Sequence, residues 1–304
     1  MDGLAGTVTQ GAFLGPLAAI ASAMTWAFGS VAYSAAARKH PTFVVNQTRA
    51  LIALPLFVAA SLLFEGTEEW GRITSEHWGW VAVSMVSSYG LGDVLFLSAT
   101  HRLGVPVALA IASCFPIWAT LLQRVSGGPE LSLAQCAGLS LVLGFGVFVI
   151  LTSATTLGLP RKGLWRGISF AGLTTVFWAI NGWAASHLGR GLGAATANSM
   201  RMVVAWAISA GLGFAWYRRR GVRFISLREL GRDGWLFAGE AFLGSYLFLY
   251  GLGHSDLVVG TTLSSLAPVI SAPAAVIMGL ERWSWRRMLG VAGVVTGIVL
   301  LVSG

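Results

Sequence analysis

Asn46-Gln47-Thr48-Arg49 decides the fold of this chain, because it lies in an otherwise apolar run and has a copy at Asn198-Ser199-Met200-Arg201. The two stretches are 152 positions apart (198 − 46). The same shift aligns Trp26 with Trp178, Gly92 with Gly244, Ser113 with Ser265, Pro116 with Pro268, and Gly138 with Gly290. Matches of rare residue types in one register are hard to reach by chance in a chain made largely of Ala, Leu, Gly and Val. The sequence therefore predicts two copies of one unit, residues 1–152 and 153–304.

The composition is that of a membrane protein. Of the 304 residues, 55% are hydrophobic and 11% are charged, against about 25% charged in soluble proteins. The net charge of +8 comes from short basic clusters between apolar runs, a placement that marks helix ends and argues against nucleic-acid binding. Cys114 and Cys136 lie in apolar segments without metal or redox spacing and are interpreted as small apolar fillers. The first ten residues lack a basic region, so the first helix is expected to direct insertion.

Ten apolar runs are long enough to cross a bilayer core of about 30 Å. They are 12–36, 43–64, 78–99, 105–124, 133–153, 165–187, 195–217, 235–253, 258–279 and 287–302. Five spans per copy return the chain on the opposite side of the membrane, so the second copy must be inverted. The predicted fold is an all-α polytopic membrane protein with two inverted five-helix repeats around a central cavity, as in secondary transporters.

The basic residues predict the orientation. Loops after odd-numbered helices carry fifteen of the twenty Lys and Arg residues, and loops after even-numbered helices carry three. By the positive-inside rule the odd loops are cytoplasmic and both termini lie outside. We expect an integral protein of a bacterial inner membrane, in contact with membrane lipid.

Four charged residues inside the runs are functional candidates, because an intramembrane charge costs about 2.5–3.5 kcal/mol on insertion scales. Counting along the helices places Arg49, Asp93 and Glu240 in the leaflet on the odd-loop side, where they can form a charge cluster. Arg201 lies toward the other face, where no intramembrane carboxylate accompanies it. The arginines are expected to gate the cavity or contact an anion, and Asp93 and Glu240 are candidates for proton coupling.

Each of these residues also has a structural interpretation. Both arginines can snorkel to the headgroups or make a purely structural hydrogen bond, and Asn46 and Asn198, which share their helix faces, can simply orient them. Asp93 is too short and too deep to snorkel, so it is expected to face a polar cavity and titrate or pair with Arg49. Glu240 is nearer a helix end, where a solvated role is the alternative.

The remaining candidates lie deep in their runs. Pro116 and Pro268 remove backbone hydrogen bonds near the middle of helices four and nine, and Ser113 and Ser265 stand ready to satisfy the freed groups. Matching bends at the midplane predict a transport cavity, and a tolerated kink without ligand contact is the alternative. Trp26, Trp178, Tyr89, Tyr246 and Asn181 are interior polar or aromatic residues that are expected to line it.

The sequence carries no His-Glu-x-x-His, Gly-x-Ser-x-Gly, Walker A lysine or cysteine pair at metal spacing. We therefore expect neither an enzyme nor a cofactor nor a metal.

These features together resemble the EamA-type members of the drug/metabolite transporter superfamily. The resemblance rests on the five-plus-five duplication, Trp26, the arginine repeated in helices two and seven, and four short motifs. Those motifs are Ser264-Ser265-Leu266-Ala267-Pro268-Val269, Gly279-Leu280-Glu281-Arg282-Trp283, Leu289-Gly290-Val291-Ala292-Gly293 and Pro129-Glu130-Leu131-Ser132. The resemblance implies ten helices around a cavity that opens alternately to each side, and export of small metabolites, often amino acids or drugs.

The function expected from the sequence is therefore alternating-access transport of a small metabolite, with protons as a candidate coupling ion and no required oligomer. An uncoupled facilitative carrier is the alternative within transport. A lipid-handling or scaffold membrane protein fits the hydropathy but not the polar groups repeated in both halves.

Overall fold

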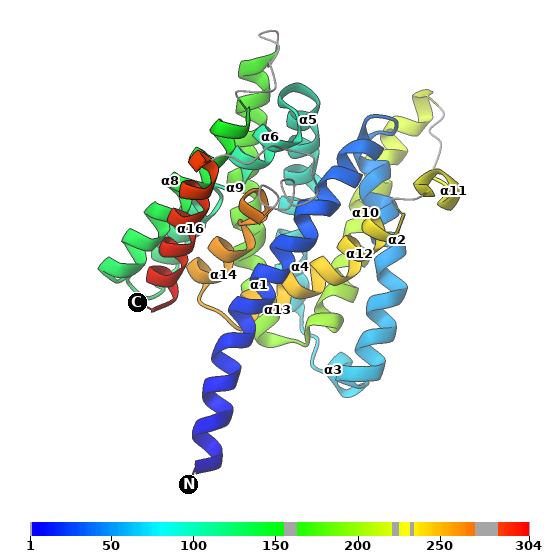
Figure 1. The fold of residues 1–304 in the computed structure, drawn as a ribbon. Helices are drawn as coiled ribbons and strands as arrows, with labels where there is room; N and C mark the ends of the chain where they lie inside the picture. Colours follow the sequence, from blue (N-terminus) through cyan, green and yellow to red (C-terminus); the bar gives the residue numbers. More distant parts are fainter. Residues whose placement is uncertain (1, 155–162, 221–224, 232–233, 271–284, 304) are drawn as a thin grey trace.

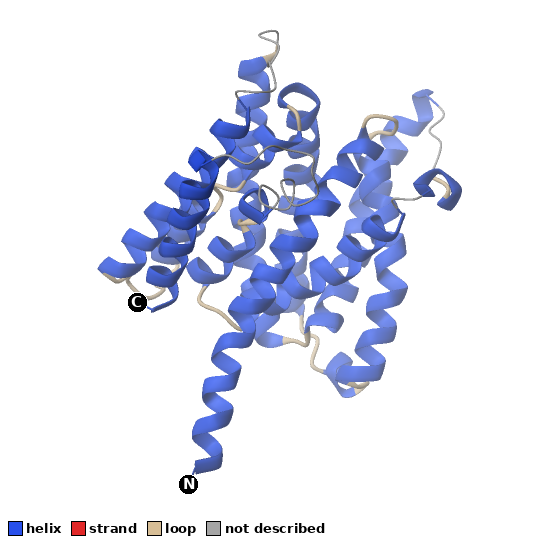
Figure 2. Ribbon diagram, viewed as in Figure 1, coloured by secondary structure: helices blue, strands red, loops and turns tan. Residues whose placement is uncertain are grey.

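The computed structural model describes residues 2–154, 163–220, 225–231, 234–270 and 285–303. These ranges are helical and contain no strand (Figure 2). The helices of the first half are α1 (Asp2–Ala37), α2 (Thr42–Ala60), η1 (Ser61–Glu65), α3 (Glu68–Gly71), α4 (Ser75–Met85), η2 (Val86–Gly92), α5 (Asp93–Leu103), α6 (Val105–Ala112), α7 (Pro116–Val125) and α8 (Leu133–Ala154). Those of the second half are α9 (Leu164–Gly191), α10 (Ala194–Arg220), α11 (Leu227–Leu230), α12 (Gly234–Gly239), η4 (Glu240–Gly244), α13 (Ser245–Gly253), α14 (Leu257–Ser264) and α16 (Trp285–Ser303).

Within the described residues each of the ten predicted runs is mainly helical, and the runs 105–124 and 258–279 are each interrupted by a turn. Among the described residues, five stretches pass the length and hydropathy criteria for a membrane span: Phe13–Ala37, Thr42–Glu65, Ser75–Leu103, Val107–Val125 and Gly234–Gly253. Shorter apolar helices cover Leu133–Phe148, Leu257–Ile270 and Leu289–Ser303. The predicted sixth and seventh runs are α9 and α10, of 28 and 27 residues, which exceed the about 20 residues that a bilayer core requires. The predicted all-α polytopic membrane class is confirmed.

The helix packing has the symmetry of a duplication. In both halves equivalent helices meet, since α2 packs against α10 and α8 against α16. The contact of α1 with α13 is repeated as that of α9 with α5, with the halves exchanged (Figure 1). A pseudo-twofold axis therefore relates the two repeats.

The paired copies run in opposite directions. Ser61, just after α2, lies 2.5 Å from the hydroxyl of Thr196, at the beginning of α10. Gly138 near the start of α8 lies so close to Gly297 near the end of α16 that a Cβ on Gly138 would clash with the facing backbone. Small residues at such crossings let membrane helices approach closely. The predicted inversion of the repeats is confirmed.

Acidic side chains after α2 hold the beginning of α10, and we call this set of contacts the Glu65 clasp. The Glu65 carboxylate accepts hydrogen bonds from the amides of Ala195 (2.8 Å) and Thr196 (2.8 Å) and from the Thr196 hydroxyl (2.7 Å). Glu69 accepts a bond from the amide of Gly193 (2.7 Å). A carboxylate at a helix N-terminus satisfies free amides and complements the helix dipole. The clasp therefore joins the two repeats electrostatically at one face.

Two predicted helices are wrong in their interiors. The run 105–124 is not a single helix bent at Pro116, because it divides into α6 and α7 around a turn at residues 113–115, and Pro116 is the first residue of α7. Proline is tolerated there because the first amides of a helix have no intrahelical acceptor. The carbonyl of Ala112 accepts a bond from the amide of Phe115 at 3.2 Å instead of from a serine hydroxyl. In the second half α14 likewise ends at Ser264, before a turn at residues 265–266, and Ser265 donates to the carbonyl of Thr262.

Candidate functional site

A cavity of ≈ 650 Å³, counted with the solvent at its opening, lies between the two repeats. Eight residues singled out in the sequence contribute to its wall: Trp26, Arg49, Tyr89, Asp93, Trp178, Asn181, Arg201 and Glu240. Ser22, Ser88, Phe115, Gly244, Ser245, Phe248 and Ser264 complete it. The lining alternates aromatic faces with a few charged and hydroxyl groups, and it comes from both halves of the chain.

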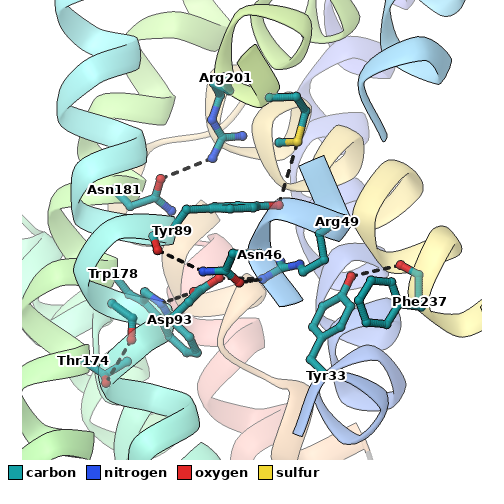
Figure 3. Close-up of polar contacts among 12 residues, drawn as sticks. Tyr33, Asn46, Arg49, Tyr89, Asp93, Thr174, Trp178, Asn181, Arg201 and Phe237 are labelled. Carbon is teal, nitrogen blue, oxygen red and sulfur yellow. Dashed lines mark hydrogen bonds and ion pairs between the residues drawn. The ribbon is translucent and has the colours of Figure 1, made fainter. Parts of the chain in front are cut away.

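Arg49 is neutralised by a carboxylate from its own repeat. Its Nη1 lies 2.5 Å from Oδ2 of Asp93, and both side chains are almost fully buried. The guanidinium also lies over the rings of Tyr33 (4.0 Å) and Tyr89 (4.6 Å), contacts that add cation–π attraction. Arg49 is thus enclosed by one negative charge and aromatic faces (Figure 3).

Arg201 is held by neutral groups. Nη1 donates to Asn198 (2.7 Å), Nη2 to Asn181 (3.2 Å) and Nε to the hydroxyl of Ser84 (3.2 Å). It is 3% exposed, and it forms no ion pair with any residue that the structure describes. A buried cation held only by dipoles keeps most of its field for a ligand.

The asparagine three residues before each arginine makes equivalent hydrogen bonds in both repeats. The side-chain oxygen of Asn46 accepts from Arg49 at 3.2 Å, and that of Asn198 accepts from Arg201 at 2.7 Å. The Asn46 amide donates to the carbonyl of Tyr89, and the Asn198 amide to that of Ser245. Neither asparagine lines the cavity, so each links an arginine to the backbone beside the cavity.

Trp178 ties the first repeat's ion pair to the second repeat. Its indole Nε1 donates to Oδ1 of Asp93 at 3.2 Å. Its ring packs edge-on against Trp26, its own copy, with centroids 5.5 Å apart, and also contacts Phe96 and Phe115. The two tryptophans are in contact at the repeat interface, and both line the cavity.

Two π-helical segments form part of the wall, and the sequence analysis did not find them. They are η2 and η4, and the 152-residue shift places η4 on residues 88–92, inside η2. Such segments are rare and occur frequently at functional sites. They bring Ser88 and Tyr89 in one repeat, and Glu240 and Gly244 in the other, to the cavity. The repeated Gly92 and Gly244 are the only sequence signal that pointed to these segments.

The structure changes two placements made from sequence. Arg201 and Arg49 were expected toward opposite faces, but both line the one cavity, on either side of the Tyr89 ring in the view of Figure 3. Glu240 is not at a solvated helix end, because it is 7% exposed and part of the cavity wall.

Five other candidates lie away from the central cavity. Ser113, Ser265 and Pro268 line a second hollow of ≈ 280 Å³, beside α8. Pro116 is buried at the start of α7. Tyr246 stacks on Tyr250 with centroids 6.2 Å apart, one helical turn along α13. The motif at residues 279–283 lies outside the described residues. Gating by these positions stays a prediction.

Comparison with known proteins agrees with the geometry. The EamA-like transporter family model matches residues 13–152 and 165–303. An uncharacterized transporter from Archaeoglobus fulgidus is 26% identical over 293 residues, covering 94% of this chain and 97% of the relative. A protein of known crystal structure superposes with a TM-score of 0.74 at 20% identity, covering 94% of each chain, and so shows the same fold. This chain is an integral membrane protein and belongs to the EamA-like transporter family.

Proposed function

We propose that this transporter moves small metabolites bearing an anionic group by alternating access, and that Arg201 contacts that group in the central cavity. The observation that carries the proposal is the state of Arg201: buried, facing the cavity, and bonded only to neutral oxygens in the described structure. Arg49 is a poor alternative because Asp93 already neutralises it. A carboxylate matches the geometry of a guanidinium that has free donor capacity, and we propose it as the anionic group.

The rest of the cavity fits such a cargo. Trp26 and Trp178 offer apolar faces beside the polar groups, as expected where a ligand is held mainly by apolar contacts and oriented by a few polar ones. The inverted repeats, which meet at this cavity, are the architecture that lets one site open to either side in turn. We further propose transport in the direction of export across a bacterial inner membrane, with coupling to protons through an intramembrane carboxylate.

Two alternatives are less well supported. An uncoupled facilitative carrier would need no titrating group in the cavity, whereas two buried carboxylates lie there. A lipid-handling or scaffold protein would need no charged cavity between its halves.

The test is ligand stabilisation of purified protein in detergent. Water-soluble amino acids and small carboxylic acids are compared with their amides by thermal unfolding, with intrinsic tryptophan fluorescence as the readout. A carboxylate ligand should stabilise the wild type, by about 2.7 kcal/mol at a hundredfold excess over its dissociation constant, and its amide should not. Arg201→Gln should lose this response, and it should fold, because the substitution leaves no carboxylate without its partner.

Arg124→Gln is the matched control, since Arg124 is exposed and pairs with Glu130 away from the cavity. It should respond as the wild type does. Equal stabilisation of Arg201→Gln and wild type by the same carboxylate would refute the role of Arg201. A wild type that responds equally to acids and amides would refute the anionic cargo.

A further inference from the structure

The two carboxylates of the cavity are in different chemical states. Asp93 uses both oxygens: Oδ2 pairs with Arg49 at 2.5 Å and Oδ1 accepts from Trp178 at 3.2 Å. A buried carboxylate with a guanidinium and an indole donor is stable as an anion, because its charge is compensated where it lies. Protonating Asp93 would leave Arg49 buried without a counter-ion, which is strongly unfavourable.

Glu240 has no such compensation. The residue is 7% exposed, its one hydrogen-bond partner is the neutral side chain of Thr25, and Oε2 is buried without a partner. No ion pair to Glu240 occurs within the described ranges. The cation that faces it, Arg49, is already paired with Asp93, and the negative charge of Asp93 opposes the effect of Arg49 on Glu240. The other titratable groups that face it, Tyr33 and Tyr89, bring no positive charge.

The backbone around Glu240 is shaped to hold this side chain. A Cβ on Gly29 of α1 would collide with Cβ and Cγ of Glu240, and a Cβ on Gly244 would collide with its carboxyl group. The side chain therefore lies in a groove formed by two glycines, one from each repeat, with its carboxyl group at the cavity wall. A merely tolerated surface glutamate would need no such groove.

An unpaired carboxylate in this position is costly when ionised and inexpensive when neutral, because burial without a partner removes its hydration. When the cavity admits water or a cargo, the ionised form regains partners. The protonation state of such a group is thus linked to the accessibility of the cavity.

From these contacts we propose that Glu240 is the group that takes up and releases a proton in this transporter, whereas Asp93 remains ionised as the partner of Arg49. The role of this proton in transport rests on the proposed function, but its assignment to Glu240 rests on the contacts alone. The two repeats differ at these positions. At a shift of 152, Ser88 is the equivalent of Glu240, and Ser245 is the equivalent of Asp93. Each repeat thus supplies one carboxylate, and only the one in η4 is left without a cation.

The test is infrared difference spectroscopy of the purified protein without any ligand, between acidic and alkaline buffer. A protonated carboxyl whose carbonyl accepts no hydrogen bond absorbs at the high-frequency end of the carboxylic-acid range, apart from exposed acids. The wild type should show one such band that disappears on alkalinisation. Glu240→Gln should lose it completely, and Asp93→Glu should keep it.

Glu130→Gln is the control, because Glu130 is exposed and paired with Arg124, so the high-frequency band should not change. If Glu240→Gln does not fold, Glu240→Asp replaces it, and a shorter acid should move the band or its titration midpoint. A band that survives Glu240→Gln, is unchanged in Glu240→Asp, disappears in a folded Asp93→Glu or is absent from the wild type would overturn the assignment.

Transport is measured separately in proteoliposomes, with the carboxylate that stabilises the protein and an imposed pH gradient. A titrating Glu240 together with uptake that ignores the gradient would refute proton coupling while leaving the protonation site in place. Gradient-driven uptake that persists in Glu240→Gln would refute Glu240 as the coupling group while leaving transport intact.

Discussion

Arg49 and Arg201 begin from the same three-residue spacing to an asparagine and end in different electrostatic surroundings. The first has Asp93 and the rings of two tyrosines around it, and the second has two asparagines and a serine. Duplication preserved the scaffold of each site, and substitutions of a few neighbours changed what the arginine can bind. The chemistry of this protein therefore depends on the residues that differ between the copies.

The glycine groove of Glu240 leads to a prediction at single-residue scale. Gly29→Ala should destabilise the protein by about 1–3 kcal/mol, the usual cost of overpacking, because the added methyl group has no room beside Glu240. Gly172→Ala in α9 is the matched control, since open space surrounds that position. It should be neutral or stabilising, by about 0.5–1 kcal/mol at most. Thermal unfolding of both variants measures the difference, and equal stability would contradict the tight packing.

Residues of rare type were the ones that the sequence could identify. Arg49, Asp93, Arg201 and the two asparagines stand out against apolar neighbours, and the pairing of Arg49 with Asp93 follows from their depth. Tyr33 and Ser84, which contact the two arginines, gave no such signal. Periodicity does not separate buried from lipid-facing positions when nearly every residue is apolar, so these supporting contacts required the fold.

At the scale of elements, regular helices followed from hydropathy and their irregularities did not. The turn before α7 and the π-helical η2 and η4 each alter backbone bonding without changing composition. Proline marked one of these sites, but its presence is compatible with both a kink and a helix start. The wrong choice between them is what misplaced Ser113 and Pro116 at the central cavity.

The Glu65 clasp supports a prediction about how the repeats are held together. Glu65→Ala removes three hydrogen bonds to a charged group at the beginning of α10. Bonds of this kind contribute about 1.5–3 kcal/mol each to stability when they are buried. We expect a loss on the order of 2 kcal/mol, because this carboxylate is only partly buried.

Thermal unfolding in detergent measures this loss, with Glu130→Gln as the control for removal of an exposed acid that joins no helices. Glu130→Gln should leave the midpoint unchanged. A Glu65→Ala midpoint equal to that of the wild type would show that the clasp does not stabilise this conformation.

At the scale of the whole molecule, the duplication predicted the architecture because it constrains every helix at once. A shift of 152 residues, applied to an odd number of spans, required the antiparallel pairing that α2 and α10 display. The repeat could not predict how far each side chain extends from its helix toward the cavity. Arg49 and Arg201 enter from opposite halves and still meet one cavity.

The orientation in the membrane is the remaining prediction at this scale. With fifteen basic residues in the odd loops, both termini should face away from the cytoplasm. Alkaline phosphatase fused after Gly304 should be active, and a fluorescent protein fused there should be dark. Fusions after Gly104, in the third loop, should behave in the opposite way. A fluorescent fusion at Gly304 would reverse the assignment.

The carboxylates of the Glu65 clasp are not repeated in the second copy, because the sequence equivalents of Glu65 and Glu69 are Tyr217 and Gly221. If transport proceeds by the proposed alternating access, we expect this difference between the two ends of the α2–α10 pair to populate the inward-open and outward-open forms unequally. Since apparent affinity falls with the fraction of molecules competent to bind, half-saturation by the same cargo should differ when it is offered from either compartment. With equal cargo concentrations and no pH or voltage gradient, net flux still vanishes, and the asymmetry appears only in the half-saturating concentration on each side.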